Sequence, residues 1–274
     1  MTVSSTVRIP PNLSSELQSE SVRLGTSENE IIESLLRASL RSRSKRLYQI
    51  STSAALVQGV LAGEISSALM MEAGDLGLGT FEDFDGEMMI IDGEIFRMGA
   101  SGVTRVGPSE IKIPFAQVCW FTSQQSCSFR KIANLLELLA TCTQCRRSEN
   151  LFYAFRIDAY FNSIHVRTVR ETPQGSSLER AGDSEATFSW SDVSGSLVGF
   201  WSPAYSASLS VPGYHFHFIS DDRTKGGHVL DCSFEKSAAH VQVLTDYEVV
   251  LPPAGAFLKA DLSIDTRSVL RKVE

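Results

Sequence analysis

The spacing of apolar residues along the chain separates a short helical front from a larger body made mostly of strands. Residues 13–24 and 31–40 carry apolar side chains at helical spacing. From residue 84 onward, short apolar runs are separated by glycine, proline and polar residues, which is typical of strands joined by turns. The predicted strands of the body are residues 84–98 (a hairpin turning at Asp92-Gly93), 103–106, 115–121, 152–164, 165–170, 196–201, 213–219, 239–244 and 247–251. The predicted helices of the body are residues 53–61, 66–71, 132–139 and 266–273, and residues 171–187 are predicted to be a long loop.

The front of the chain, residues 1–46, has the pattern of a separate module. Thr6–Ile9 alternates as a short strand would, and a helix follows until Gly25, a residue that commonly ends helices. Ser27 and Glu30 form a capping box that starts the second helix. Residues 41–46 are basic and polar, and we interpret them as a linker.

This order of a strand, a helix, a glycine-capped turn and a capped helix resembles the ribbon-helix-helix family of dimeric DNA-binding proteins. The resemblance implies a homodimer in which Val7 and Ile9 point into the core while Thr6 and Arg8 point outward. Arg8 alone is an obvious candidate for contacting a DNA groove, so we expect nucleic-acid binding less than dimerisation. The alternative is a helical hairpin that packs on the body or only mediates dimerisation.

A histidine-rich stretch, residues 213–231, holds three of the five histidines of the chain. His215 and His217 alternate with aromatic residues, so on a strand both imidazoles project from one face. The polar residues 220–227 predict a hairpin loop that returns His228 on the neighbouring strand. Three neutral imidazoles leave the fourth position of a tetrahedral Zn²⁺ ion open, as in catalytic zinc sites. The alternative is three unrelated histidines near a turn.

Other polar residues are weaker candidates for a site. Arg167 and its rival Arg156 carry a planar guanidinium group that suits a carboxylate ligand. Glu87 begins an apolar strand and is either a solvated strand end or a partly buried catalytic carboxylate. The glycines of residues 74–81 precede no Lys-Ser/Thr pair, so they predict a close backbone or ligand approach and no phosphate loop. The isolated pair Cys142 and Cys145 lacks a second pair nearby, and we interpret it as incidental.

Composition and charge narrow the class of protein. A chain of 274 residues can bury a full core as one large or two modest domains. The net charge of −7 disfavours nucleic-acid binding by the body. Five scattered cysteines, the lack of a membrane-length apolar run and an N-terminus without a secretory pattern predict a cytoplasmic protein with reduced thiols.

A series of short motifs links these elements. They lie, in order, at residues 47–49, 74–81, 85–87, 114–116, 151–158, 167–169, 198–200, 212–219, 226–231 and 273–274. Together they resemble the alpha-acetolactate decarboxylase family over about residues 47–274, which we expect to form the catalytic domain behind the N-terminal module. The chain departs from the family at Ala73, where the family has a histidine that is no zinc ligand.

The resemblance implies an α+β fold of mixed and antiparallel β-sheets with flanking helices, here preceded by the small strand-helix-helix module. It implies a carboxy-lyase that converts 2-acetolactate to acetoin and carbon dioxide, with Zn²⁺ stabilising the enediolate. The family's zinc ligands fall on His215, His217 and His228. Its further site residues fall on Glu87, Arg167, the terminal Glu274 and Thr80.

The resemblance also suggests roles for these residues. Arg167 is expected to bind the substrate carboxylate or the developing charge. A glutamate must protonate the enediolate, and the sequence does not choose between Glu87 and Glu274.

Two other functions compete with the decarboxylase as explanations of the sequence. One is a DNA-binding regulator whose body senses a ligand and keeps the metal site, and it depends on residues 1–46 alone. The other is a metal hydrolase that uses the same ligands with a metal-bound water as nucleophile, which the long series of motifs disfavours.

Overall fold

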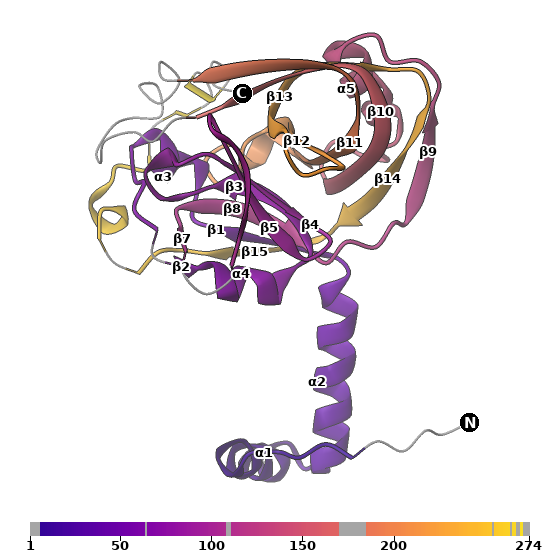
Figure 1. Cartoon of the computed structure of the whole chain (residues 1–274). Coiled ribbons are helices and arrows are strands. Elements are labelled where there is room, and N and C mark those ends of the chain that lie inside the picture. Colours follow the sequence, from indigo (N-terminus) through magenta and orange to yellow (C-terminus); the bar gives the residue numbers. More distant parts are fainter. Residues whose placement is uncertain are drawn as a thin grey trace. The chain divides into compact units, whose positions relative to one another are not determined.

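The computed structural model describes residues 6–63, 65–107, 111–169, 185–253, 255–263, 265–266 and 269–270. The chain divides into two compact units, Met1–Arg43 and Ser44–Glu274, which are described separately (Figure 1). We call the second unit the body. No helix among the described residues is long and apolar enough to span a membrane.

The first unit contains two helices, α1 (Pro11–Leu24) and α2 (Glu28–Arg43). Gly25 ends α1 with φ at +63°, a left-handed conformation that glycine adopts without steric cost. The predicted capping box is confirmed, because the Glu30 carboxylate accepts the Ser27 N–H at 2.9 Å and the Glu30 N–H donates to the Ser27 hydroxyl at 3.3 Å. Each helix therefore begins or ends where the local sequence predicts.

Two predictions for this unit are wrong in the single chain. Thr6–Ile9 is not a strand here, and Val7, whose predicted burial requires a second chain, is 76% exposed. A strand needs a partner for its backbone hydrogen bonds, and an isolated four-residue segment has none. The predicted linker is helical as far as Arg43, because α2 continues through Arg41 and Ser42.

The body is built on two sheets, which confirms the predicted α+β fold. Within the described residues, the seven-stranded sheet has the order β15-β1-β8-β3-β4-β5-β6. It is mixed, because β1 pairs in parallel with β15 and the other neighbours pair antiparallel. Its strands are β1 (Arg46–Ile50), β3 (Leu76–Thr80), β4 (Glu87–Ile91), β5 (Glu94–Gly99), β6 (Gly102–Val106), β8 (Phe115–Cys119) and β15 (Asp246–Val250).

The six-stranded sheet is antiparallel and has the order β11-β12-β13-β10-β14-β9. Because β11 also pairs with β10, strands β10 to β13 form a closed ring, visible at the top of Figure 1. Its strands are β9 (Gln125–Phe129), β10 (Phe152–Thr168), β11 (Ala186–Ser202), β12 (Gly213–Ser220), β13 (Gly226–Phe234) and β14 (Ser237–Leu244).

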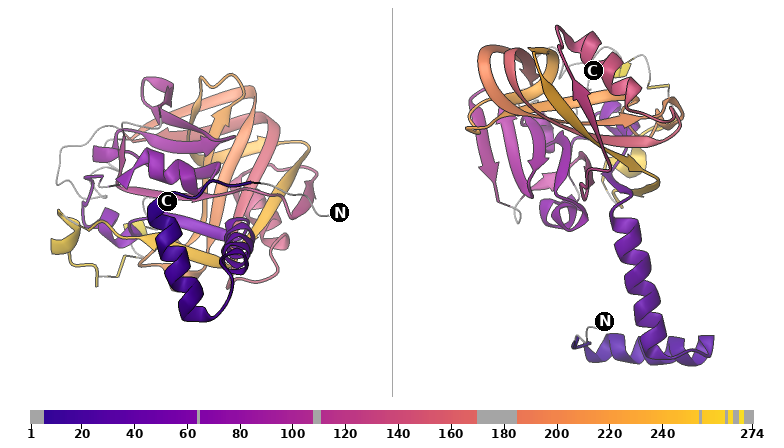
Figure 2. Two further views of the ribbon diagram at one scale, coloured as in Figure 1. Left: turned by 90° about the horizontal axis from the view of Figure 1, so that it is seen from below. Right: turned by 90° about the vertical axis from the view of Figure 1, so that its right-hand side faces the viewer.

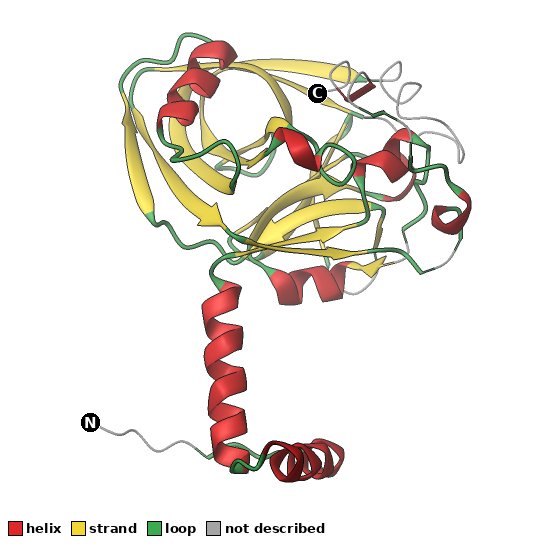
Figure 3. Cartoon of the chain, turned by 180° about the vertical axis from the view of Figure 1, so that it is seen from behind, coloured by secondary structure: helices red, strands yellow, loops and turns green. Residues whose placement is uncertain are grey.

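Short helices and a minor sheet complete the body, and Figure 3 shows how much of this unit is strand. The helices are α3 (Ser53–Val57), α4 (Ser67–Ala73) and α5 (Leu135–Gln144), with single 3-10 turns at Glu82–Phe84, Ala204–Ser206 and Phe257–Lys259. Strands β2 (Ile65–Ser66) and β7 (Lys112–Ile113) pair with each other. The predicted C-terminal helix lies mostly outside the described residues.

The three largest hydrophobic clusters among the described residues hold these layers together. The largest contains Phe155, Phe161, Phe216 and Phe218 from the ring of strands, with Leu138 of α5 packed among them. A second contains residues of both sheets, and a third contains residues of the seven-stranded sheet together with Met70 of α4. Figure 2 shows the two sheets from two further directions. Burial of these side chains is the main stabilising contribution to the body.

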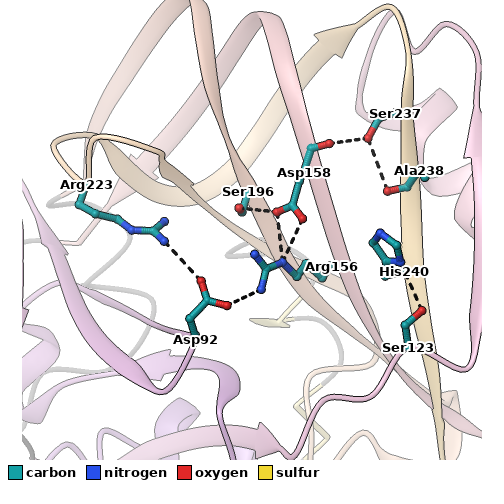
Figure 4. A network of polar contacts seen from close by, with 9 residues as sticks. All are labelled: Asp92, Ser123, Arg156, Asp158, Ser196, Arg223, Ser237, Ala238 and His240. Carbon is teal, nitrogen blue, oxygen red and sulfur yellow. Dashed lines mark hydrogen bonds and ion pairs between the residues drawn. The ribbon is translucent and has the colours of Figure 1, made fainter.

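A cluster of charged side chains joins the two sheets in addition to apolar packing (Figure 4). Asp92, in the β4–β5 turn, accepts a hydrogen bond from Arg156 of β10 at 2.6 Å. The same carboxylate lies 3.6 Å from Arg223 in the β12–β13 turn. Arg156 also pairs with Asp158, which accepts a hydrogen bond from Ser196 of β11.

The boundaries of several predicted elements shift. Helix α5 begins at Leu135, where Asn134 caps it, and not at Ile132. Helix α3 ends at Val57, before Gly59, whose φ is +74°. Strand β11 begins at Ala186, ten residues before the predicted start, because its polar first half pairs with β10 on one edge. Strand β9 was not predicted.

Candidate active site

The three predicted histidines meet at the face of the ring that is turned toward β4. His215 and His217 lie on β12 and His228 lies on β13, directly opposite His217 in the strand register. All three are buried, and one ligand atom from each lies within 4.8 Å of the others. The three side chains can therefore hold a metal ion.

The alternation of β12 explains why both of its histidines project from the same face. Phe216 and Phe218 belong to the cluster inside the ring, whereas Ile219 belongs to the cluster between the sheets. Because successive side chains of a strand point to opposite faces, His215 and His217 are on the side of Ile219. This part of the sequence prediction is confirmed.

The imidazole of His217 is held in a defined orientation. Its Nδ1 lies 2.7 Å from the carbonyl oxygen of Met88 on β4, and a carbonyl can only accept, so Nδ1 carries the hydrogen. The Nε2 atom of His217 then offers its lone pair, 3.1 Å from Nε2 of His215. Two nitrogen ligands of a tetrahedral Zn²⁺ ion are separated by about 3.3 Å, so this spacing fits a shared cation.

Burial also favours the form of the histidines that binds metals. Desolvation lowers the pKa of His217 to about 3, opposed by its hydrogen bond to Met88, and it lowers the pKa of His215 well below its ordinary value. Both imidazoles are therefore neutral near pH 7, and a neutral imidazole is the form that coordinates a metal ion.

Glu87 lies beside the histidines as the first residue of β4. Its Oε2 is 3.5 Å from Nε2 of His217, and its Oε1 is 3.8 Å from Nη1 of Arg167. Burial raises the pKa of Glu87 to about 7, while the charge of Arg167 lowers this pKa and that of Glu185 raises it. Of the two alternatives for Glu87, the solvated strand end is wrong, because the residue is buried.

Arg167 and Arg156, the two candidate arginines, occupy different places. Arg167 is buried near the end of β10 and lies opposite His228 in the strand register. Arg156 belongs to the charged cluster that joins the sheets, with Asp92 and Asp158 as partners. Of the two, Arg167 is therefore the one that can meet a ligand at the histidines.

Thr80 is buried on β3, opposite Glu87 in the register of the two strands. Its hydroxyl donates a hydrogen bond to the carbonyl oxygen of Gly86 at 3.1 Å. The glycines just before it allow close contact between strands, since a Cβ on Gly79 would lie 2.3 Å from the carbonyl oxygen of Phe115. Glu274, the remaining predicted site residue, lies outside the described residues.

Sequence reasoning missed Glu185. Its Oε1 accepts a hydrogen bond from Nη1 of Arg167 at 2.6 Å. The residue directly precedes β11, in a stretch that the sequence predicted as loop, so no strand pairing with Arg167 could be inferred. The polar and aromatic alternation of residues 186–190 was the available signal for a strand here.

The cysteine pair lies away from this site. Cys142 and Cys145 are buried in the cluster that fills the ring, and Cys142 is on α5. Burial raises the pKa of Cys145 to about 12 and that of Cys142 well above its ordinary value. Thiols in this state are poor nucleophiles and poor metal ligands at neutral pH.

Comparisons with known proteins assign the residues after the front module to one family. A sequence model of the alpha-acetolactate decarboxylase family matches residues 47–264. The alpha-acetolactate decarboxylase of Methanosarcina mazei is 38% identical over 246 residues, which cover 89% of this chain and 85% of that protein. That of Raoultella terrigena is 35% identical over 251 residues, covering 91% and 97%.

A solved structure gives the same result for the fold. The crystal structure of alpha-acetolactate decarboxylase from Bacillus subtilis strain 168 superimposes with a TM-score of 0.80 at 30% identity. The superposition covers 84% of this chain and 99% of that one.

Proposed function

Because this chain belongs to the alpha-acetolactate decarboxylase family, we propose that it converts 2-acetolactate to acetoin and carbon dioxide at the histidine triad. The observation that carries the proposal is the convergence of three buried imidazoles beside a buried glutamate and a buried arginine. A 2-hydroxy-3-keto acid matches this set, since it presents two neutral oxygens and one carboxylate.

We propose Zn²⁺ as the metal, held by His215, His217 and His228. An all-imidazole donor set suits zinc, and three protein ligands leave room for a substrate. When bound, the ion would supply Lewis-acid stabilisation of negative charge on the ketone oxygen of the substrate. The β-keto group is itself the electron sink, so no organic cofactor is required.

The side chains around the triad have complementary roles in this proposal. Arg167 binds the substrate carboxylate, or the charge that develops as carbon dioxide leaves. Glu87, whose burial brings its pKa to about 7, can hold or release a proton near neutral pH. Glu274 is the second candidate for delivering the proton to the enediolate, and Thr80 is proposed to contact the substrate.

One experiment separates this function from its rivals. The purified chain is analysed for metal and assayed for acetoin after addition of racemic 2-acetolactate. We expect about one zinc ion per chain and rapid acetoin formation. Absence of acetoin, with hydrolysis of ester or amide substrates instead, would favour the hydrolase. Absence of acetoin with salt-dependent retardation of DNA would favour the regulator.

We further propose that residues 1–46 form a module distinct from the catalytic domain and join two chains into a homodimer. Four leucines of α1 and α2 are more than half exposed, namely Leu24, Leu35, Leu36 and Leu40, while Ile31 is the buried apolar residue among those described in this unit. A helical pair of this size gains too little from one buried side chain to be stable alone.

We also propose a cytoplasmic location. Each of the five cysteines is a free thiol, in keeping with a reducing compartment.

A further inference from the structure

Glu185 is hydrogen-bonded to Arg167, the arginine in the site. The distance from Nη1 of Arg167 to Oε1 of Glu185 is 2.6 Å, whereas the distance from the same nitrogen to Glu87 is 3.8 Å. The side chain of Arg167 is 7% exposed and that of Glu185 is 23% exposed. The two carboxylates therefore flank one guanidinium group that is almost removed from water.

The pairing of β10 with β11 explains this contact. Arg167 of β10 lies opposite Thr187 of β11 in the strand register. Glu185 precedes Thr187 by two residues in the sequence, so it is the diagonal neighbour of Arg167. Side chains two residues apart share a face, and long side chains reach across such a diagonal. Backbone geometry thus brings Glu185 to Arg167, and the pairing does not depend on a ligand.

The contact has an electrostatic consequence for any anion that binds at Arg167. A buried guanidinium without a counter-ion is costly, and Glu185 offsets that cost in the free protein. A substrate carboxylate that approaches Arg167 meets the like charge of Glu185 at short range, where screening by water is reduced. Neutralising Glu185 removes this repulsion and leaves the guanidinium charge in place.

We propose that Glu185 sets the affinity of the site for anionic ligands, because its carboxylate and the ligand carboxylate compete for Arg167. The inference rests on the proposed function, in which Arg167 binds the substrate carboxylate. Glu185 is a specificity-determining residue in this scheme and takes no part in bond breaking. It holds Arg167 in the free protein and limits how tightly a carboxylate binds.

The test uses the full-length, metal-loaded protein and two small probes. The anionic probe, 2-hydroxy-2-methylbutanoate, carries the hydroxyl and carboxylate of acetolactate without the ketone, so it cannot be decarboxylated in the same way. The neutral probe is acetoin. Dissociation constants are measured by calorimetry for the wild type and for Glu185→Gln, whose amide oxygen can still accept from Arg167.

We expect Glu185→Gln to bind the anionic probe about three- to tenfold more tightly, because one nearby negative charge is removed. Binding of acetoin should not change, since it carries no charge. Glu185→Asp keeps the charge and should stay close to the wild type. Glu94→Gln is the matched control, because it removes one carboxylate from an ion pair with Arg105 on the β5–β6 edge, and it should change neither affinity.

Three results would overturn the proposal. The first is an unchanged or weaker affinity of Glu185→Gln for the anion. The second is an equal tightening for acetoin, which would indicate a change of shape and not of charge. The third is an anion affinity that Arg167→Gln leaves unaltered, because Arg167 would then not be the receptor.

The test separates this inference from the proposed function. Tighter anion binding by Glu185→Gln in a protein that forms no acetoin would refute the decarboxylase and leave the role of Glu185 standing. Acetoin formation with a KM that does not fall in Glu185→Gln would do the reverse.

Discussion

The carboxylate of Asp92 accepts a hydrogen bond from Arg156 across the two sheets, with 2.6 Å between Oδ1 and Nη1 (Figure 4). Asp92 is in the turn of the hairpin whose first strand begins with Glu87, and Arg156 lies on the strand that carries Arg167. The contact therefore ties together the two elements that supply the polar residues beside the histidines. Apolar packing holds the sheets together, and this ion pair adds a fixed alignment between them.

Replacement of Asp92 by Asn should weaken this link. Asp92 is 54% exposed and Arg156 is 26% exposed, so solvent screens the pair and we expect a loss of only about 0.5–1 kcal/mol in the free energy of unfolding. Urea unfolding measures it. Glu94→Gln, two residues along the same hairpin, breaks an ion pair within one sheet and should cost less. Equal losses of unfolding free energy in the two variants would show that the ion pair between the sheets stabilises the body no more than one within a sheet.

Loss of one imidazole should abolish metal binding at the triad. His228→Gln removes one of three ligands, and we expect the metal content and acetoin formation to fall together by at least about a hundredfold. Metal analysis and the acetoin assay measure both. His240→Gln is the control, because His240 lies on β14 and contacts Ser123. A His228→Gln protein that retains its metal would contradict the assignment of the ligands.

Removal of the metal should lower thermal stability. A ligand that binds the folded state stabilises it in proportion to the logarithm of its concentration over Kd. A chelator should therefore lower the unfolding temperature of the wild type by several degrees and leave His228→Gln almost unchanged. The same decrease in both proteins would mean that the chelator acts elsewhere.

Glu87 and Glu274 should differ in their effect on the reaction. Glu87 lies within 4 Å of both His217 and Arg167, so Glu87→Gln should reduce kcat by about a hundredfold or more. If Glu274 delivers the proton, Glu274→Gln should also lower the enantiomeric purity of the acetoin. Turnover and chiral analysis of the product distinguish the two. Full turnover and unchanged stereochemistry in either variant would remove that residue from its role.

The pattern of β12 and β13 made the meeting of the three histidines predictable from the sequence. Strand periodicity set the face of His215 and His217, and the polar turn set the return of His228. Both inferences need only local rules, which is why they succeed. Glu87 and Arg167 were candidates on residue type, but their approach to the triad depends on how two sheets pack, which no local pattern encodes.

Long-range pairing explains the remaining failures. Glu185 was missed because the first half of β11 has a polar sequence, and its strand conformation comes from pairing with β10 over the full length of both strands. The parallel pairing of β1 with β15 joins residues about 200 positions apart. For Thr6–Ile9 the sequence predicted a strand that the structure does not contain. Its alternation is typical of a strand, but a single chain offers no neighbouring strand for it to pair with.

The capping box of α2 should respond to acid. Hydrogen bonds from the Thr26 side chain, then from the Ser27 N–H and hydroxyl, lower the pKa of Glu30 from its ordinary value of about 4.5 to about 2. A lowered folded-state pKa means that this contribution to stability is complete above about pH 4.5 and is lost as pH falls toward about 2.

Titration of Glu30 by NMR in the full chain tests this. Thr26→Val removes the largest cause of the shift and should raise the pKa toward its ordinary value. Ser15→Ala, which alters a hydroxyl bonded to Pro11 on α1, should leave it unchanged. A Glu30 pKa of about 4.5 in the wild type would contradict the hydrogen-bonded cap.

Removal of the front module should change the oligomeric state and spare the chemistry. A chain that begins at Ser44 keeps the Ser44 carbonyl bonded to Gln242 and the Lys45 carbonyl bonded to Thr245, so the edge of the body stays intact. We expect light scattering to report a dimer for the full chain and a monomer for the shortened one, with kcat within about twofold.

Leu36→Glu in the full chain should also give a monomer, since it places a charge on an exposed apolar surface of α2 that a partner would bury. Glu33→Gln, which alters an exposed ion pair with Arg37 on the same helix, should remain dimeric. A shortened chain that is still a dimer would show that the body carries the interface, and a monomeric full chain would exclude the module as a dimerisation element.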